Sequence, residues 1–205
     1  MRLRTLAAVV AAACITVPAA HADGDPASDY LLSQSTFIPF DAKISKSQAE
    51  QLSTVVAEAK QKGFTIRVAL ISKAFDLGAV PSLWRKPKTY ARFLGQELFF
   101  VYKGRLLVVM PNGYGVSRGG KPLASAQRVA DALPEPGEGG AALAEAATRA
   151  VQRLAAQEGV RVEIPAASSG DGSTSDRIVI AAIAGGLVLL ILAGFAARRL
   201  LTRAA

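Results

Sequence analysis

The sequence predicts an α/β fold, in which a small sheet with packed helices lies between an N-terminal signal peptide and one C-terminal transmembrane helix. Three observations predict it. Stretches with apolar residues at helical spacing alternate with short β-branched runs, as they do in α/β domains. The first 22 residues have the layout of a secretory signal. Residues 178–197 contain no charged or strongly polar side chain.

The N-terminal segment, residues 1–22, begins with two basic residues, Arg2 and Arg4, followed by a short apolar run. Small residues up to Ala22 then offer a cleavage point, which completes the signal-peptide pattern. Pro18 and the shortness of the run argue against a membrane helix here. Processing as a lipoprotein at Cys14 is an alternative, but no large aliphatic residue stands three positions before it.

The apolar segment 178–197 is long enough to cross a bilayer, because a helix rises about 1.5 Å per residue and the hydrocarbon core is about 30 Å thick. The tail 198–205 carries three arginines, and clustered arginines stay on the cytoplasmic side. We therefore expect a single-pass protein of the cell membrane, with its N-terminal domain outside and its C-terminus in the cytoplasm. Ala182 and Gly186 form a small-x-x-x-small pair that would let two such helices dimerise.

Between these ends we expect a loose segment over 23–34, an extracytoplasmic α/β domain over 35–164 and a flexible linker over 165–177, which is rich in small polar residues. Residues 23–176 carry 18 Lys and Arg against 16 Asp and Glu, although the whole chain has a net charge of +8. The basic excess therefore belongs mostly to the targeting segments, and we expect no nucleic-acid partner.

The only histidine, His21, and the only cysteine, Cys14, both lie in the predicted signal peptide. The mature domain therefore lacks the side chains of ordinary zinc sites, of Cys-His nucleophiles and of Ser-His-Asp triads. We predict no catalytic residue, no cofactor and no metal site from motifs. Asp41 and Asp76 are the weak candidates for holding a divalent cation.

The first elements of the domain are clearly marked. Ser45 and Gln48 form a capping-box pattern, and apolar residues at helical spacing follow, which predicts a helix over 45–63. The β-branched run 64–72 predicts a buried strand. Pro87 suits the first turn of a second helix, over 86–99.

The second half of the domain is less regular. Residues 99–111 hold two apolar runs separated by Lys103 and Gly104, which indicates either a hairpin or one interrupted strand. The stretch PNGYG that follows is a turn signal. Further along we expect helices over 122–133 and 141–159 and a last strand over 160–165.

The stretch GVSRGGKP, residues 115–122, matches a phosphate-binding P-loop except at Pro122, where the motif needs Ser or Thr. Proline removes both the hydroxyl for Mg²⁺ and a backbone N–H for phosphate. We therefore interpret the stretch as a corner from strand to helix. In this interpretation Gly113, Gly115, Gly119 and Gly120 are turn residues, and Pro122 opens the helix.

Basic side chains are concentrated in the middle of the domain. Residues 60–128 hold 13 Lys and Arg and only two acids, Asp76 and Glu97. Such a segment suits an anionic lipid or wall polymer, unless the acidic flanks neutralise it in the folded protein. The candidate basic surface consists of Arg85, Lys86, Lys88, Arg92, Lys103, Arg105, Arg118 and Lys121.

A capped helix, the strand FTIRVALIS, a second helix, the stretch GRLLVVMPNGYGV and a C-terminal membrane helix follow one another in this chain. This order resembles the TPM-domain family of membrane-anchored α/β domains, over roughly residues 35–160. The resemblance implies a compact domain that faces away from the cytoplasm. Phosphatase activity has been proposed for some family members and accessory roles in membrane-protein maintenance for others.

The sequence departs from the family pattern where chemistry would lie, because no paired acids stand near the predicted strand ends. Our main hypothesis is therefore a membrane-tethered, extracytoplasmic binding or accessory module that contacts a partner protein or an anionic envelope surface. The alternative is a metal-assisted phosphatase of the TPM type, with Asp41 and Asp76 brought together by folding. Nucleotide binding at residues 115–121 is the third and least supported hypothesis.

Overall fold

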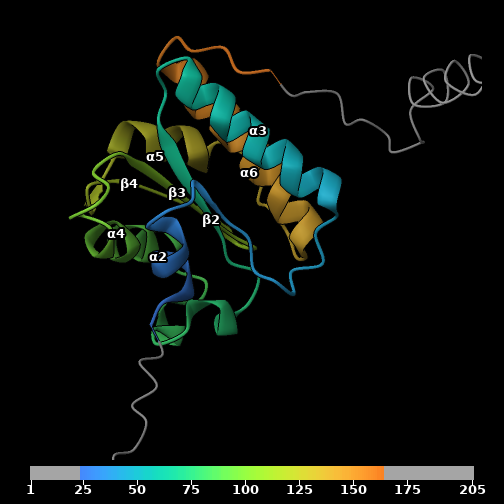
Figure 1. The fold of residues 1–205 in the computed structure, drawn as a ribbon, viewed down its shortest axis with the longest axis vertical. Coiled ribbons are helices and arrows are strands. Elements are labelled where there is room, and N and C mark those ends of the chain that lie inside the picture. Colours follow the sequence, from blue (N-terminus) through green and yellow to red (C-terminus); the bar gives the residue numbers. More distant parts are fainter. Residues whose placement is uncertain (1–23, 164–205) are drawn as a thin grey trace, which may run out of the picture. The chain divides into compact units, whose positions relative to one another are not determined.

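The structure is a computed structural model, and it describes residues 24–163 (Figure 1). The predicted signal peptide, linker, transmembrane helix and cytoplasmic tail lie outside these residues. Within them, no helix has the length and apolar character needed to span a membrane.

The described residues form an α/β domain with a mixed five-stranded sheet, which confirms the predicted class. The strands lie in sequence order, and the first three are parallel while the last two run antiparallel to their neighbours. They are β1 (Thr36–Phe37), β2 (Ile66–Leu70), β3 (Arg105–Met110), β4 (Gly113–Arg118) and β5 (Lys121–Pro122).

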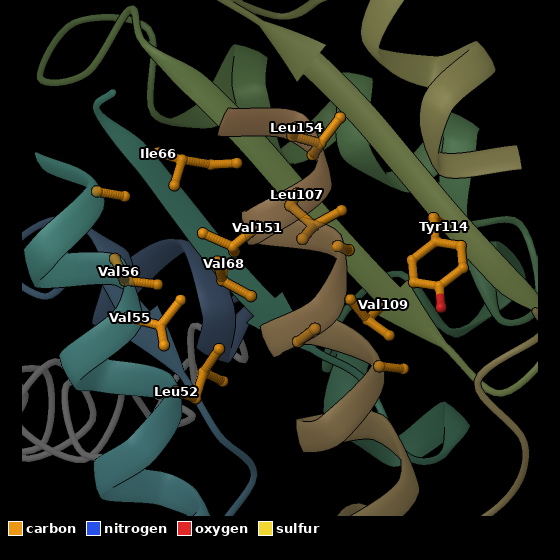
Figure 2. Packing of buried hydrophobic residues seen from close by; sticks show 14 of the residues in the cluster. Leu52, Val55, Val56, Ile66, Val68, Leu107, Val109, Tyr114, Val151 and Leu154 are labelled. Atoms are coloured by element: carbon orange, nitrogen blue, oxygen red, sulfur yellow. The ribbon is translucent and has the colours of Figure 1, made fainter. Parts of the chain in front are cut away.

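Three helices cover one face of the sheet: α3 (Lys46–Gln61), α5 (Ala124–Asp131) and α6 (Gly140–Gln157). Figure 2 shows side chains of α3 and α6 directed toward Val68 of β2 and Leu107 of β3. The predicted capping box begins α3, because Ser45 Oγ accepts from the Gln48 N–H while Gln48 Oε1 accepts from the Ser45 N–H.

The opposite face is covered by α2 (Pro26–Leu31) and α4 (Pro87–Glu97) (Figure 1). Successive side chains of β3 point to opposite faces of the sheet: Leu107 packs toward α6, whereas Leu106 and Val108 pack toward α4. A strand that is buried on both faces must be apolar at every position, which explains the continuous hydrophobic runs in the sequence.

Both hydrophobic clusters are built from residues between Ala27 and Val162. The described segment therefore contains a complete core, with helices that bury both faces of the sheet. A segment that buries its own apolar surfaces in this way folds as an independent unit.

Three parts of the domain differ from the prediction. Residues 23–34 do not form a loose segment throughout, since α2 lies there with Ala27 and Leu31 fully buried. In 99–111 there is neither a hairpin nor an interrupted strand, because only Arg105–Met110 pairs with other strands. Residues 160–163, the described part of the expected last strand, lie outside the sheet.

The glycine-rich stretch is also different: Gly113–Arg118 is strand β4, and the helix begins at Ala124 rather than at Pro122. Gly119 and Gly120 turn the chain into β5, so the P-loop look-alike is an antiparallel hairpin and not a strand-to-helix corner. Gly115 is required by packing, because a Cβ atom there would lie 1.9 Å from the carbonyl oxygen of Pro87 in α4.

Candidate functional site

Part of the predicted basic surface is neutralised by acids from other elements. The Arg105 guanidinium binds Glu158 in two places, one of them an Nε–Oε1 hydrogen bond of 2.8 Å. Arg85 and Lys88 form ion pairs with the acidic segment that precedes α6 and with the end of α5. The three pairs are Arg85–Glu138 (2.6 Å), Lys88–Asp131 (2.8 Å) and Arg105–Glu158.

The remaining five basic side chains make no ion pair within residues 24–163: Lys86, Arg92, Lys103, Arg118 and Lys121. All five are exposed. Arg92 lies on α4, and Arg118 and Lys121 lie on the adjacent β4–β5 hairpin. Lys103 lies in the turn between α4 and β3, whereas Lys86 precedes α4 at its other end.

A shallow hollow of about 280 Å³ joins α4 to the hairpin. Arg92 and Lys121 lie on its lining, and Gly120 packs so closely on α4 that a Cβ there would lie 2.6 Å from Gln96 Cγ. The two cations therefore share one surface although they are far apart in the sequence. The hollow is lined by Thr89, Arg92, Phe93, Gln96, Gly120, Lys121 and Pro122.

Beyond the end of α4 the chain exposes three consecutive apolar side chains, which we call the aromatic turn: Phe99, Phe100 and Val101. Their exposed fractions are 41%, 93% and 61%. Lys103 Nζ lies 4.6 Å from the centroid of the Phe99 ring. The hairpin glycine Gly119 lies beside the same ring, so the aromatic turn borders the basic surface.

The backbone of the aromatic turn is held in place. The N–H groups of Val101 and Tyr102 both donate to the Leu98 carbonyl, at 2.9 and 2.7 Å. Burial raises the pKa of Tyr102 to about 12, so its hydroxyl stays protonated and donates to the Arg105 carbonyl at 2.7 Å. The guanidinium of Arg67 lies 4.2 Å from the centroid of the Tyr102 ring.

These features lie at the end of the sheet where β3 begins, which we call the amino end. Arg118 pairs with Arg105, the first residue of β3, and the aromatic turn immediately precedes that strand. The last helix also ends here, because Glu158 binds Arg105. The described chain then reaches Glu163, whose N–H contacts Glu58 Oε1 at 3.4 Å.

A second candidate surface lies at the carboxyl ends of β1 and β2, which we call the carboxyl-end cleft. This position is the usual one for ligands of open α/β sheets. The cleft has a volume of about 400 Å³, and both predicted metal candidates, Asp41 and Asp76, line it. Its lining consists of Pro26, Tyr30, Phe37, Ile38, Pro39, Phe40, Asp41, Phe75 and Asp76.

The two aspartates are engaged by donors from the segment after β2. Asp76 Oδ2 accepts from the Ser72 N–H at 2.7 Å, the Ser72 hydroxyl at 2.8 Å and the Lys73 N–H at 3.0 Å. The Lys73 ammonium binds Asp41, and this hydrogen bond lowers the pKa of Asp41. Folding thus brings the two acids to one cleft, but with an ammonium group beside them.

A hard divalent cation does not fit this arrangement. Ca²⁺ and Mg²⁺ need several converging oxygen ligands. Asp41 already binds the Lys73 ammonium, and Asp76 Oδ2 already accepts three hydrogen bonds. No group of three or more His, Cys, Asp or Glu side chains suited to a metal occurs in the described part of the chain.

The sequence patterns did not reveal one buried polar pair, Asp25 and Tyr90. Asp25 lies within the segment expected to be loose, yet it is 6% exposed, and burial raises its pKa from 3.8 to about 6. The negative charge of Glu97 adds to this shift. The only sequence signal for Asp25 was its place before Pro26, typical of a helix N-cap.

No family model, no curated protein and no solved structure matches this chain. The resemblance to the TPM-domain family therefore remains an expectation drawn from the sequence motifs.

Proposed function

We propose that this protein is a membrane-tethered binding module whose extracytoplasmic domain contacts an anionic surface of the cell envelope, rather than an enzyme. The observation that carries the proposal is the group of unpaired cations near the amino end of the sheet. Arg92, Lys103, Arg118 and Lys121 are exposed and have no acidic partner within residues 24–163.

The separation of the basic side chains into ion-paired and unpaired groups supports this function. Arg85, Lys88 and Arg105 are held by carboxylates, so they contribute little field to a partner. The unpaired four carry their full charge into solvent, and such clustered charges attract anionic surfaces and raise association rates. The attraction is screened by salt over a Debye length of about 8 Å at physiological ionic strength.

The test uses residues 24–163, which contain the whole core, after cooperative unfolding shows that the fragment is folded. We expect it to co-sediment with vesicles of phosphatidylglycerol and phosphatidylcholine, and to dissociate as the salt concentration rises. Pure phosphatidylcholine vesicles are the control. Failure to bind, or binding of equal strength at low and high salt, would rule out the anionic lipid version of this function.

A contact with an acidic partner protein would use the same surface, and the same fragment distinguishes it from binding to anionic lipid. If the partner is an acidic protein, the fragment should bind that protein through its basic surface and should not bind anionic vesicles.

The TPM-type phosphatase is the alternative function. It is tested by hydrolysis of p-nitrophenyl phosphate with and without Mg²⁺ or Ca²⁺, and turnover that is lost in Asp76→Asn would support it over the binding module.

A further inference from the structure

The chemistry of the amino end allows its partner to be specified further, on the basis of the proposed function. We infer that the anionic surface is a phospholipid bilayer, and that the aromatic turn inserts into its interface. Phe100 and Val101 would enter the boundary between headgroups and acyl chains. Lys103, Arg118 and Lys121 would contact the anionic headgroups around them.

The exposure of the aromatic turn is the first reason. Phe100 is 93% exposed and Val101 61% exposed, beside Phe99 at 41%. Water solvates such side chains poorly, and three in succession form a contiguous apolar projection. An acidic polysaccharide has no apolar phase that could receive them. The interface of a bilayer receives both apolar side chains and the basic side chains beside them.

The second reason is that the projection is already in a fixed conformation. The Leu98 carbonyl accepts from two successive N–H groups of the turn, and the Tyr102 ring is held between the Arg67 guanidinium and the Arg105 carbonyl. A turn that is ordered before it binds loses little conformational entropy on insertion. Phe100 therefore projects from a turn with a defined conformation and not from a flexible loop.

The third reason is the arrangement of charge around the turn. Lys103 lies against the Phe99 ring, and the hairpin that carries Arg118 and Lys121 packs beside the same ring. Basic residues close to an anionic leaflet each add to the attraction. An apolar tip with a cationic surround matches an anionic interface in both polarity and charge.

The place where the described chain ends is the fourth reason. Glu158 and the following residues to Glu163 lie at the amino end of the sheet, as the aromatic turn does. The transmembrane segment expected from the sequence begins 15 residues after Glu163, at Ile178. Even fully extended, 15 residues span only about 50 Å. If that expectation is right, a tether of this length would keep the whole domain near one bilayer, at a high effective concentration, and its attachment at the amino end would favour that end as the one that docks.

The opposite end of the domain supplies internal controls. Phe75 is 83% exposed in the carboxyl-end cleft, at the ends of the strands remote from the aromatic turn. Trp84, the only tryptophan, adjoins Arg85, whose carbonyl accepts from Asn112 in the turn after β3. Both positions should therefore stay outside the bilayer when the amino end is docked.

The experiment uses the full chain reconstituted in vesicles of phosphatidylglycerol and brominated phosphatidylcholine. Bromine quenches tryptophan only at short range. After the Trp84 signal of the wild type is subtracted, we expect the fluorescence that Phe100→Trp adds to fall at least about twofold against unbrominated vesicles, while the wild-type signal itself stays unchanged. Phe75→Trp is the matched control and should not be quenched beyond the wild-type signal.

A second measurement keeps the inference testable without tryptophan. In fragment 24–163, Phe100→Ser with Val101→Ser should weaken binding to anionic vesicles about tenfold, whereas Phe75→Ser should leave it unchanged. Because Phe100 and Val101 are exposed, these variants should fold as the parent does.

The outcomes separate the inference from the proposed function on which it rests. If the fragment binds anionic vesicles in a salt-dependent way but Phe100→Trp is not quenched, insertion is wrong and the binding module stands. If the fragment does not bind at all, insertion is wrong and so is the anionic lipid version of the proposed function, whereas a contact with an acidic partner protein stands. Equal quenching of Phe100→Trp and Phe75→Trp would overturn the assigned orientation.

Discussion

The phenolic hydroxyl of Tyr90 donates hydrogen bonds to both carboxylate oxygens of Asp25, at 2.7 Å to Oδ1 and 2.8 Å to Oδ2. The two residues are 65 positions apart in the sequence. Tyr90 is fully buried in α4, and Asp25 caps α2 by accepting from the Ala27 N–H at 3.1 Å. This contact anchors the beginning of the described chain to the face of the sheet that α4 covers.

Removing the Tyr90 hydroxyl should lower the stability of the protein. In Tyr90→Phe the buried carboxyl group loses the bifurcated hydrogen bond from the phenolic hydroxyl while the packing of the ring is retained. We expect the free energy of unfolding to fall by roughly 1–3 kcal/mol, the usual effect of leaving a buried polar group unsatisfied. Urea unfolding measures it. Tyr30→Phe is the control, since Tyr30 is 54% exposed and should change stability by less than about 0.5 kcal/mol.

Asp25 should also make stability depend on pH. Burial raises its pKa from 3.8 to about 6, so the folded state binds this proton more tightly than the unfolded state does. The stabilisation from the protonated carboxyl is complete below pH 3.8 and is lost as the pH rises through about 6. Across that window Asp25→Asn should gain roughly 3 kcal/mol relative to the wild type.

The measurement is the difference in unfolding free energy between Asp25→Asn and the wild type at several pH values. Using the difference removes the opposite trend of carboxylates such as Asp41, whose pKa is lowered by its hydrogen bond to Lys73. Asp29→Asn, an exposed position in the same helix, is the control. A difference that does not vary between pH 4 and pH 7 would contradict the assignment to Asp25.

The close approach of β4 to α4 depends on a glycine. In Gly115→Ala the new methyl group would meet the Pro87 carbonyl, and the contact involves backbone that cannot rotate away. We expect a loss of about 1–3 kcal/mol or more, seen as a lower unfolding midpoint. Gly113→Ala is the comparison, because open space surrounds it and only its φ of 137° opposes alanine. A larger loss at Gly113 would show that backbone strain matters more than this contact.

The division of the basic residues into paired and unpaired groups gives a matched test. Lys103→Gln with Lys121→Gln and Arg85→Gln with Lys88→Gln remove the same charge from fragment 24–163. We expect the first pair to weaken binding to anionic vesicles and to flatten its salt dependence. The second pair should have a smaller effect, because Arg85 and Lys88 lie at the start of α4, whereas the aromatic turn follows the end of that helix. Equal effects would mean that net charge alone drives binding.

The carboxyl-end cleft should not respond to divalent cations. Millimolar Ca²⁺ or Mg²⁺ should leave the unfolding midpoint of the protein unchanged, because the Lys73 ammonium binds Asp41 and three donors occupy Asp76 Oδ2. Thermal unfolding with and without each ion measures this. A rise in the midpoint that disappears in Asp76→Asn would contradict it and favour the phosphatase alternative.

Several elements could be predicted because their signals are local. The capping box of Ser45 and Gln48 and the apolar spacing that follows identify α3, and the same periodicity identifies α6. Strand β4 was not predicted, because its glycines are typical of a turn and not of a strand. Its conformation is stabilised by pairing with β3 along the whole strand, and that pairing has no local pattern.

By itself the sequence determined the α/β class, the main helices, the central strands and the identity of the basic residues, all through short-range periodicity and composition. Only the tertiary structure decided which cations are neutralised, since Arg105 meets Glu158 across 53 residues while Lys103 meets no acid among the described residues. It likewise decided that Asp25 is buried beneath Tyr90. Ion pairing and desolvation depend on distances between residues that are remote along the chain, and these distances exist only after the sheet and its helices have packed.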